Sequence, residues 1–221
     1  HYRSSNRNEV NYYRVVASRE GASINFDPPL TSIATHGTIA SGLPDCRSLA
    51  RGDSVTLDAM GWCEFGTRSN FLLRSDRPVQ MVQFISSQTT TGIRGYEEYA
   101  GDPAMTAVPA LEQYRSQYTF LTPDTYQLNF VNIIHPEGAI LELDGISVTL
   151  GAMGNPGRTP FIEVDSQPIG TSSGWALTIV RLDSGQHTIE SATMDRFGIM
   201  VYAYDDYVSY AFPGGLDLAK R

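Results

Sequence analysis

Lysine is almost missing from this 221-residue sequence: of the 16 basic residues only Lys220 is a lysine, next to the last position. A phosphate-binding P-loop, a Schiff-base lysine and a lysine general base all require an internal lysine side chain. These three kinds of catalytic site are therefore excluded. Arginine stands almost everywhere that lysine is common, which is typical of a GC-rich coding genome, so we expect a bacterial source.

Positive charge and long apolar runs are scarce as well. The 24 Asp and Glu residues outnumber the 16 Lys and Arg residues, for a net charge of −8 and a pI of about 4.9. Nucleic-acid binding needs a basic stripe for the phosphates, so this class of partner is excluded. No apolar run reaches the roughly 18 residues of a membrane-spanning helix. Hydrophobic residues still make up 41% of the chain, which argues against disorder.

Only two cysteines occur, Cys46 and Cys63, and without a CxxC pattern they do not indicate a zinc site. In an oxidising compartment a disulfide between them would close a loop and stabilise the fold by roughly 3 kcal/mol. Two unrelated buried thiols are the alternative. We predict the disulfide, because the spacing suits a hairpin-like return and the polar surroundings do not suit buried thiols.

Short apolar runs punctuated by Gly, Pro and Asp fill most of the chain. Runs of this length and spacing predict strands, at 13–17, 23–26, 55–57, 62–65, 71–73, 79–85, 118–121, 128–134, 140–143, 146–150, 161–164, 175–182, 187–191 and 198–204. The first two flank Arg19-Glu20-Gly21, which indicates a hairpin. Only 109–117 has a brief helical pattern.

This pattern predicts an all-β fold of two sandwich-like (jelly-roll or Ig-like) antiparallel units with little helix. Residues 86–110 are polar and weakly patterned, so we place the domain boundary there, with units at 1–100 and 101–221. Two turn segments are interpreted as structural. Gly101-Asp102-Pro103 sets a bend in which Asp102 caps backbone donors, and Asp144-Gly145 forms a type I′ hairpin turn.

Candidate catalytic groups are present but poorly arranged. The stretch 170–174 matches the GxSxG pattern, yet a nucleophile elbow needs a following helix, and residues 175–180 have the pattern of a strand. Asp183 and His187 would have to complete the triad within one hairpin. The histidines show no metal-binding spacing. A pair of carboxylates of the glycosidase type stays open, because such pairing depends on the tertiary structure.

Other residues favour binding. Tyr207 lies in a tyrosine-rich stretch after Asp205-Asp206, and Tyr96 and Tyr99 lie in the long polar connection. Exposed tyrosines beside carboxylates are typical of protein and glycan contact surfaces, so these five residues are the candidate ligand contacts. Calcium at Asp205-Asp206 is a weaker alternative, without an EF-hand pattern. Arg51-Gly52-Asp53 is either an integrin-type tripeptide or an ordinary turn.

An ordered set of segments spans nearly the whole chain and resembles a known family. The segments are 14–17 with 24–29, 74–79 with 83–84, 101–105, 109–115 with 118–120, 143–145, 169–172, 184–187, 201–202, and 209–210 with 213–215. In this order they resemble the N-terminal domain family of IgG-Fc-binding protein, found widely in bacterial surface and secreted proteins. The resemblance implies an extracellular β-rich binding or adhesion module, without recognised catalytic residues and without established ligand contacts.

Three functions follow in order of preference. The first is an extracellular or cell-surface binding module of a larger protein, recognising protein or glycan, with neither enzymatic activity nor a cofactor. The second is a structural subunit of an appendage or coat assembled by strand pairing, and the third is a β-sandwich carbohydrate-active enzyme. The family region begins upstream of Tyr12, so the chain resembles its later part. We therefore expect another segment or chain to cover open sheet edges.

Overall fold

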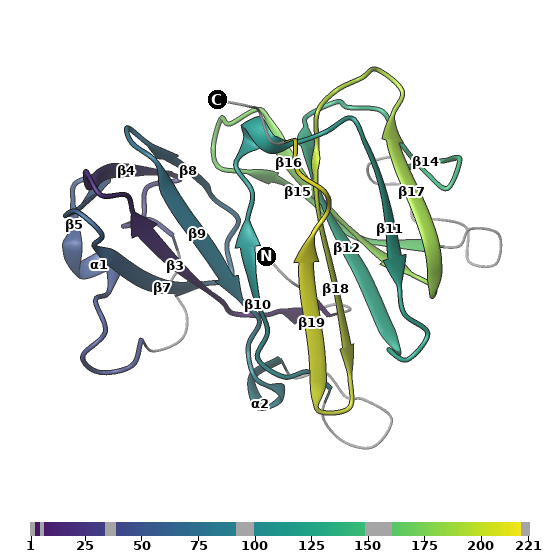
Figure 1. Ribbon diagram of the computed structural model, residues 1–221, viewed down its shortest axis with the longest axis horizontal. Helices are drawn as coiled ribbons and strands as arrows, with labels where there is room; N and C mark the ends of the chain where they lie inside the picture. Colours follow the sequence, from purple (N-terminus) through teal and green to yellow (C-terminus); the bar gives the residue numbers. More distant parts are fainter. Residues whose placement is uncertain (1–2, 5–6, 34–38, 92–99, 149–160, 218–221) are drawn as a thin grey trace.

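The computed structural model describes residues 3–4, 7–33, 39–91, 100–148 and 161–217 (Figure 1). They form two β-sandwiches that lie side by side, as Figure 1 shows. The described helices are short: α1 (Cys46–Leu49), α2 (Gln88–Thr91) and the 3₁₀ helix η1 (Leu111–Gln113). The predicted fold class, all-β with two antiparallel sandwich-like units and little helix, is confirmed.

The first sandwich has two antiparallel four-stranded sheets. One has the order β10-β9-β3-β7, made of Met105–Val108, Val79–Phe84, Asn11–Ala17 and Trp62–Thr67. The other has the order β5-β6-β4-β8, made of Ala50–Arg51, Ser54–Leu57, Ala22–Asp27 and Leu72–Ser75. A separate two-stranded ribbon precedes them, β1 and β2 (Arg3–Ser4 and Arg7–Asn8).

The hairpin predicted around Arg19-Glu20-Gly21 is wrong. β3 pairs with β7 and β9, whereas β4 pairs with β6 and β8, so the chain crosses here from one sheet to the other. Alternate residues are buried along both strands, among them Val15 and Ile24. These side chains meet in the core between the sheets, and the burial comes from facing the opposite sheet rather than from pairing with each other.

The second sandwich joins a five-stranded sheet to a four-stranded one. The larger sheet has the order β15-β16-β12-β18-β19, made of Phe161–Ile169, Trp175–Leu182, Leu128–Pro136, Gly198–Asp205 and Val208–Pro213. The smaller has the order β11-β17-β13-β14, made of Gln117–Thr122, Gly185–Ser191, Leu141–Leu143 and Ile146–Val148. Asp144 and Gly145, both with positive φ, form the two-residue turn from β13 to β14.

The domain boundary between residues 100 and 101 stays a prediction. The strand pairing adds one fact to it: β10 pairs antiparallel with β9, with Met105 opposite Phe84. Residues 105–108 therefore complete a sheet of the first sandwich before the chain passes through η1 to the second.

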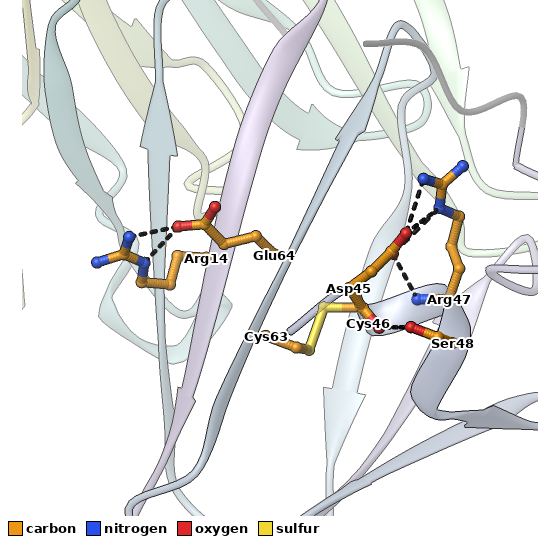
Figure 2. Close-up of a disulfide and its surroundings, with 7 residues drawn as sticks. All are labelled: Arg14, Asp45, Cys46, Arg47, Ser48, Cys63 and Glu64. Carbon is orange, nitrogen blue, oxygen red and sulfur yellow. Dashed lines mark hydrogen bonds and ion pairs between the residues drawn. A yellow bond between two sulfur atoms is a disulfide. The ribbon is translucent and has the colours of Figure 1, made fainter. Parts of the chain in front are cut away.

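The predicted disulfide is confirmed. Its surroundings are the buried hydrophobic core and not the polar environment on which the prediction partly rested. Cys46 opens α1 and Cys63 lies in β7, with Cα atoms 4.9 Å apart and both residues fully buried in the first core (Figure 2). The Asp45 carboxylate caps α1 by accepting the Arg47 backbone N–H at 2.9 Å. The disulfide and this cap together hold α1 against the edge strand β7.

Breaking this bridge should weaken the first sandwich. The disulfide closes a loop with a sequence separation of 17, so the double variant Cys46→Ala/Cys63→Ala should lose about 3 kcal/mol of unfolding free energy. Urea denaturation under oxidising conditions measures the change against the unmodified chain. Equal unfolding midpoints for the two proteins would contradict the stabilising role.

Candidate binding surface

The outer face of the five-stranded sheet packs against the first sandwich. β12 and β18 are therefore buried on both faces: Val131 and Val201 point into the second core, whereas Phe130 and Tyr202 point toward the first unit. Phe130 stacks on Tyr202 with ring centroids 5.2 Å apart. The first unit contributes Ile85 to this shared core. The two sandwiches thus enclose a third hydrophobic cluster between them.

A buried polar pair joins the two units inside this cluster. The Tyr204 hydroxyl donates to Glu9 Oε2 over 2.7 Å, and both residues are almost completely buried. Glu9 precedes β3, whereas Tyr204 lies in β18, so the bond spans most of the chain. This hydrogen bond offsets part of the cost of burying the Glu9 side chain, and the pair fixes where the start of β3 lies on the second sheet.

A second polar contact joins the end of β4 to the β15–β16 turn. Asp27 Oδ1 accepts from the Thr171 backbone N–H at 2.9 Å and from the Thr171 hydroxyl at 2.8 Å. The neighbouring Gly170 has a φ of +70°, and a Cβ there would lie 2.8 Å from the Asp27 carboxylate carbon. Asn70 also donates to Gln167 at 3.3 Å. The close approach of the Gly170 backbone to Asp27 requires glycine at position 170.

The candidate contacts Asp205, Asp206 and Tyr207 lie together at the β18–β19 turn. Tyr207 has a φ of +56° and is 51% exposed. Asp205 Oδ1 accepts from Gln127 Nε2 at 2.5 Å and from the Asp206 backbone N–H at 2.7 Å, so one carboxylate braces the turn from two sides. The other two candidates, Tyr96 and Tyr99, lie outside the described residues.

The segment that begins at Ala100 docks on this turn. Ala100 forms an isolated bridge with Asp206, and the Gly101 backbone N–H donates to the Asp205 carbonyl at 2.8 Å. Gly101 has a φ of +99°, which suits glycine. The contacts of Asp102 with the Ser209 hydroxyl use its backbone N–H and C=O. Pro103 follows within the same connection to β10.

A groove of about 1110 Å³ lies between the two units. Its wall from the first unit includes the continuous stretch 70–81, which contains the whole of β8, and also Gln83. Its wall from the second unit includes Tyr114, Trp175 and Leu177. Tyr114 and Trp175 contact each other edge to face, with ring centroids 5.8 Å apart. The groove is therefore a mixed apolar and polar surface shared by both units.

The remaining motifs take up structural positions. Residues 170–174 form the β15–β16 turn and lead into a strand rather than the helix of a nucleophile elbow. His187 Nδ1 lies 2.7 Å from Asp144 Oδ2, so it ties β17 to the β13–β14 turn. Arg51-Gly52-Asp53 is an exposed turn between β5 and β6, where Arg51 donates to the Ala50 carbonyl at 2.9 Å.

No three His, Cys, Asp or Glu side chains of the described residues gather as a metal site would require. No helix among the same residues has the length and apolarity to cross a membrane.

Together these features define a disulfide-bonded all-β protein in which two sandwiches share a buried core, a groove and a braced surface turn. The family model described as IgGFc binding protein matches residues 1–203, and the chain belongs to that family. This confirms the resemblance drawn from the ordered segments. No curated protein and no solved structure matches the chain.

Sequence reasoning missed the residues that join the two units. Glu9, Asp27 and Thr171 are ordinary polar residues in their local sequence, and only the packing makes them contacts. One signal was available: β18 is apolar without alternation from Gly198 to Tyr204, and β12 has the adjacent apolar pairs 130–131 and 133–134. In an antiparallel fold such runs indicate a sheet covered on both faces, and therefore a second unit against it.

Two glycines of the β15–β16 turn give a matched test of the close approach. Gly170 and Gly174 both have positive φ, +70° and +74°, but of the two only Gly170 has neighbours within 4 Å of the place that a Cβ would occupy. Gly174→Ala should therefore lower the free energy of unfolding by about 1–2 kcal/mol, which is the cost of holding alanine in a left-handed backbone conformation. Gly170→Ala should cost about 1–3 kcal/mol more, because the methyl group strikes Asp27. Thermal unfolding compares the two, and equal losses would contradict the assignment.

The Asp27 contact should also depend on pH. Hydrogen bonds from Thr171, first its backbone N–H and then its hydroxyl, lower the pKa of Asp27 below the ordinary value of 3.8. Because the pKa of Asp27 is lower in the folded state, the stabilising contribution of its carboxylate is full above pH 3.8. This contribution is lost as the pH falls through the folded-state pKa. The difference in melting temperature between the original chain and Asp27→Asn should shrink across this range. A constant difference would contradict it.

Proposed function

We propose that this chain is an extracellular or cell-surface binding module of a larger protein, and that its ligand is a protein. Its family is described by the binding of IgG Fc, which is itself a protein. The proposal takes the ligand class from that description and not the ligand itself. The buried Cys46–Cys63 disulfide supports an oxidising compartment, because such bridges persist outside the cytosol.

The observation that carries the proposal is the braced β18–β19 turn. Tyr207 is exposed at its tip, and Val208 beside it is 41% exposed. Asp205 and the docked residue Gly101 hold the backbone from two sides. An aromatic side chain presented on a rigid turn binds with little loss of conformational freedom, and such tyrosines are frequent hot spots of protein interfaces.

The proposed contact surface consists of Asp205, Asp206 and Tyr207, with Tyr96 and Tyr99 as further contacts on grounds of sequence. In this surface Tyr207 supplies the apolar anchor. The Asp206 carboxylate and the Asp205 oxygen that does not brace the turn supply acceptors for donor groups of the ligand and set its position. Recognition of this kind requires neither catalysis nor a cofactor.

The test uses a panel of immobilised extracellular proteins, IgG Fc among them, beside a glycan array. For a bound protein, Tyr207→Asn should weaken binding by about fivefold or more, because asparagine tolerates the positive φ but removes the ring. Met194→Asn is the matched control, since Met194 is also exposed with a positive φ of 60° and precedes β18 at its opposite end.

The two variants and the two arrays separate the outcomes. Loss of protein binding in Tyr207→Asn alone supports the proposed surface. Equal binding by both variants would place the ligand elsewhere, and binding to glycans without any protein would overturn the ligand class.

A further inference from the structure

The strand β8 is an open sheet edge. Among the described residues it pairs with β4 alone, with Leu73 opposite Phe26 and Arg74 opposite Asn25. In an antiparallel pair, alternate residues direct their N–H and C=O groups away from the partner strand. Two of the four β8 residues therefore present hydrogen-bonding backbone groups outward. Proteins normally cover such an edge or pair it.

This edge faces a space of a size that suits a polypeptide strand. All four residues of β8 line the groove between the sandwiches. Four residues of strand span about 13 Å, and the volume of about 1110 Å³ exceeds the upper range of small-molecule pockets, about 1000 Å³. Leu72 and Trp175 offer apolar surface on opposite walls. An extended chain therefore fits the groove better than a compact small molecule does.

A buried donor in the groove has no acceptor among the residues that the structure describes. Gln83 lines the groove and is only 6% exposed. Its Nε2 is buried and makes no hydrogen bond to any described residue. A buried amide without a partner is costly, and native proteins leave few of them. A ligand carbonyl in the groove would satisfy this donor.

The charge of the β8 wall indicates one more feature of the ligand. Arg74 is exposed, lines the groove and forms no ion pair within 4 Å among the described residues, although its charge acts at longer range on the Asp27 carboxylate and lowers the pKa of that group. By contrast, Arg77 lies 3.6 Å from Glu20. A carboxylate on the ligand would therefore find its partner at Arg74.

We propose that the groove between the sandwiches binds an extended polypeptide segment of a partner protein, which adds as a strand to β8 and places an acidic side chain at Arg74. The backbone of this segment pairs with the outward groups of β8, and one of its carbonyls accepts from Gln83. A glycan offers hydroxyl groups but not the regular row of N–H and C=O groups that an open strand edge pairs with. The site is separate from the β18–β19 turn.

The test selects ligands for the whole 221-residue chain from a phage-displayed library of random dodecapeptides. Selected peptides should be rich in Asp or Glu and should protect the β8 amides from hydrogen exchange. Arg74→Gln should weaken their binding by about fivefold or more, and glutamine adds no negative charge near Asp27. Arg51→Gln is the matched control, because Arg51 is exposed at β5, the opposite edge of the same sheet. The affinity of this control for the peptides should be unchanged.

A second measurement changes the peptide and keeps the protein as it is. Peptides N-methylated at alternate positions should lose binding in one register and keep it in the other, because only one set of N–H groups faces β8. Gln83→Leu should also weaken binding, whereas Tyr207→Asn should not, which separates this site from the proposed protein-contact turn. The proposal is overturned if no peptide is enriched, if glycans bind in place of peptides, or if selected peptides leave β8 unprotected.

Discussion

The burial of both faces of the five-stranded sheet is the constraint on which the rest of this structure depends. One face closes the second sandwich through Val131 and Val201, and the other packs Phe130 and Tyr202 toward the first. Apolar surface on both faces of the sheet must be removed from water. Each unit therefore covers apolar surface that the other would otherwise expose. The Tyr204–Glu9 hydrogen bond fits inside this contact and fixes its position.

The groove is a consequence of this packing. It lies between the packed units, with β8 from the first and Trp175 from the second among its lining residues. Asp27 and Thr171 hold the units together beside it. Among the described residues, β8 keeps an open strand edge beside this groove and Gln83 Nε2 has no acceptor, and the proposed peptide site rests on these two features. The braced Tyr207 turn is a second exposed surface on the same structure.

Local sequence patterns predicted the elements better than their partners. Alternating apolar residues correctly indicated strands such as β11, where Tyr118 and Phe120 are buried, and the spacing of Cys46 and Cys63 predicted their disulfide. The same alternation in β3 and β4 suggested a hairpin, although the two strands lie in opposite sheets. Alternation reports that one face of a strand is buried, but it does not report which strand lies beside it.

By itself the sequence determined the all-β class, the disulfide, the family and the exclusion of lysine chemistry, because each depends on composition, spacing or the order of motifs along the chain. Only the tertiary structure decided that, among the described residues, β8 is an open edge and Gln83 Nε2 has no acceptor, and that Asp27 contacts Thr171. The physical reason is that these properties come from contacts between residues far apart in the chain. Such contacts form only when two cores and the surface between them pack together.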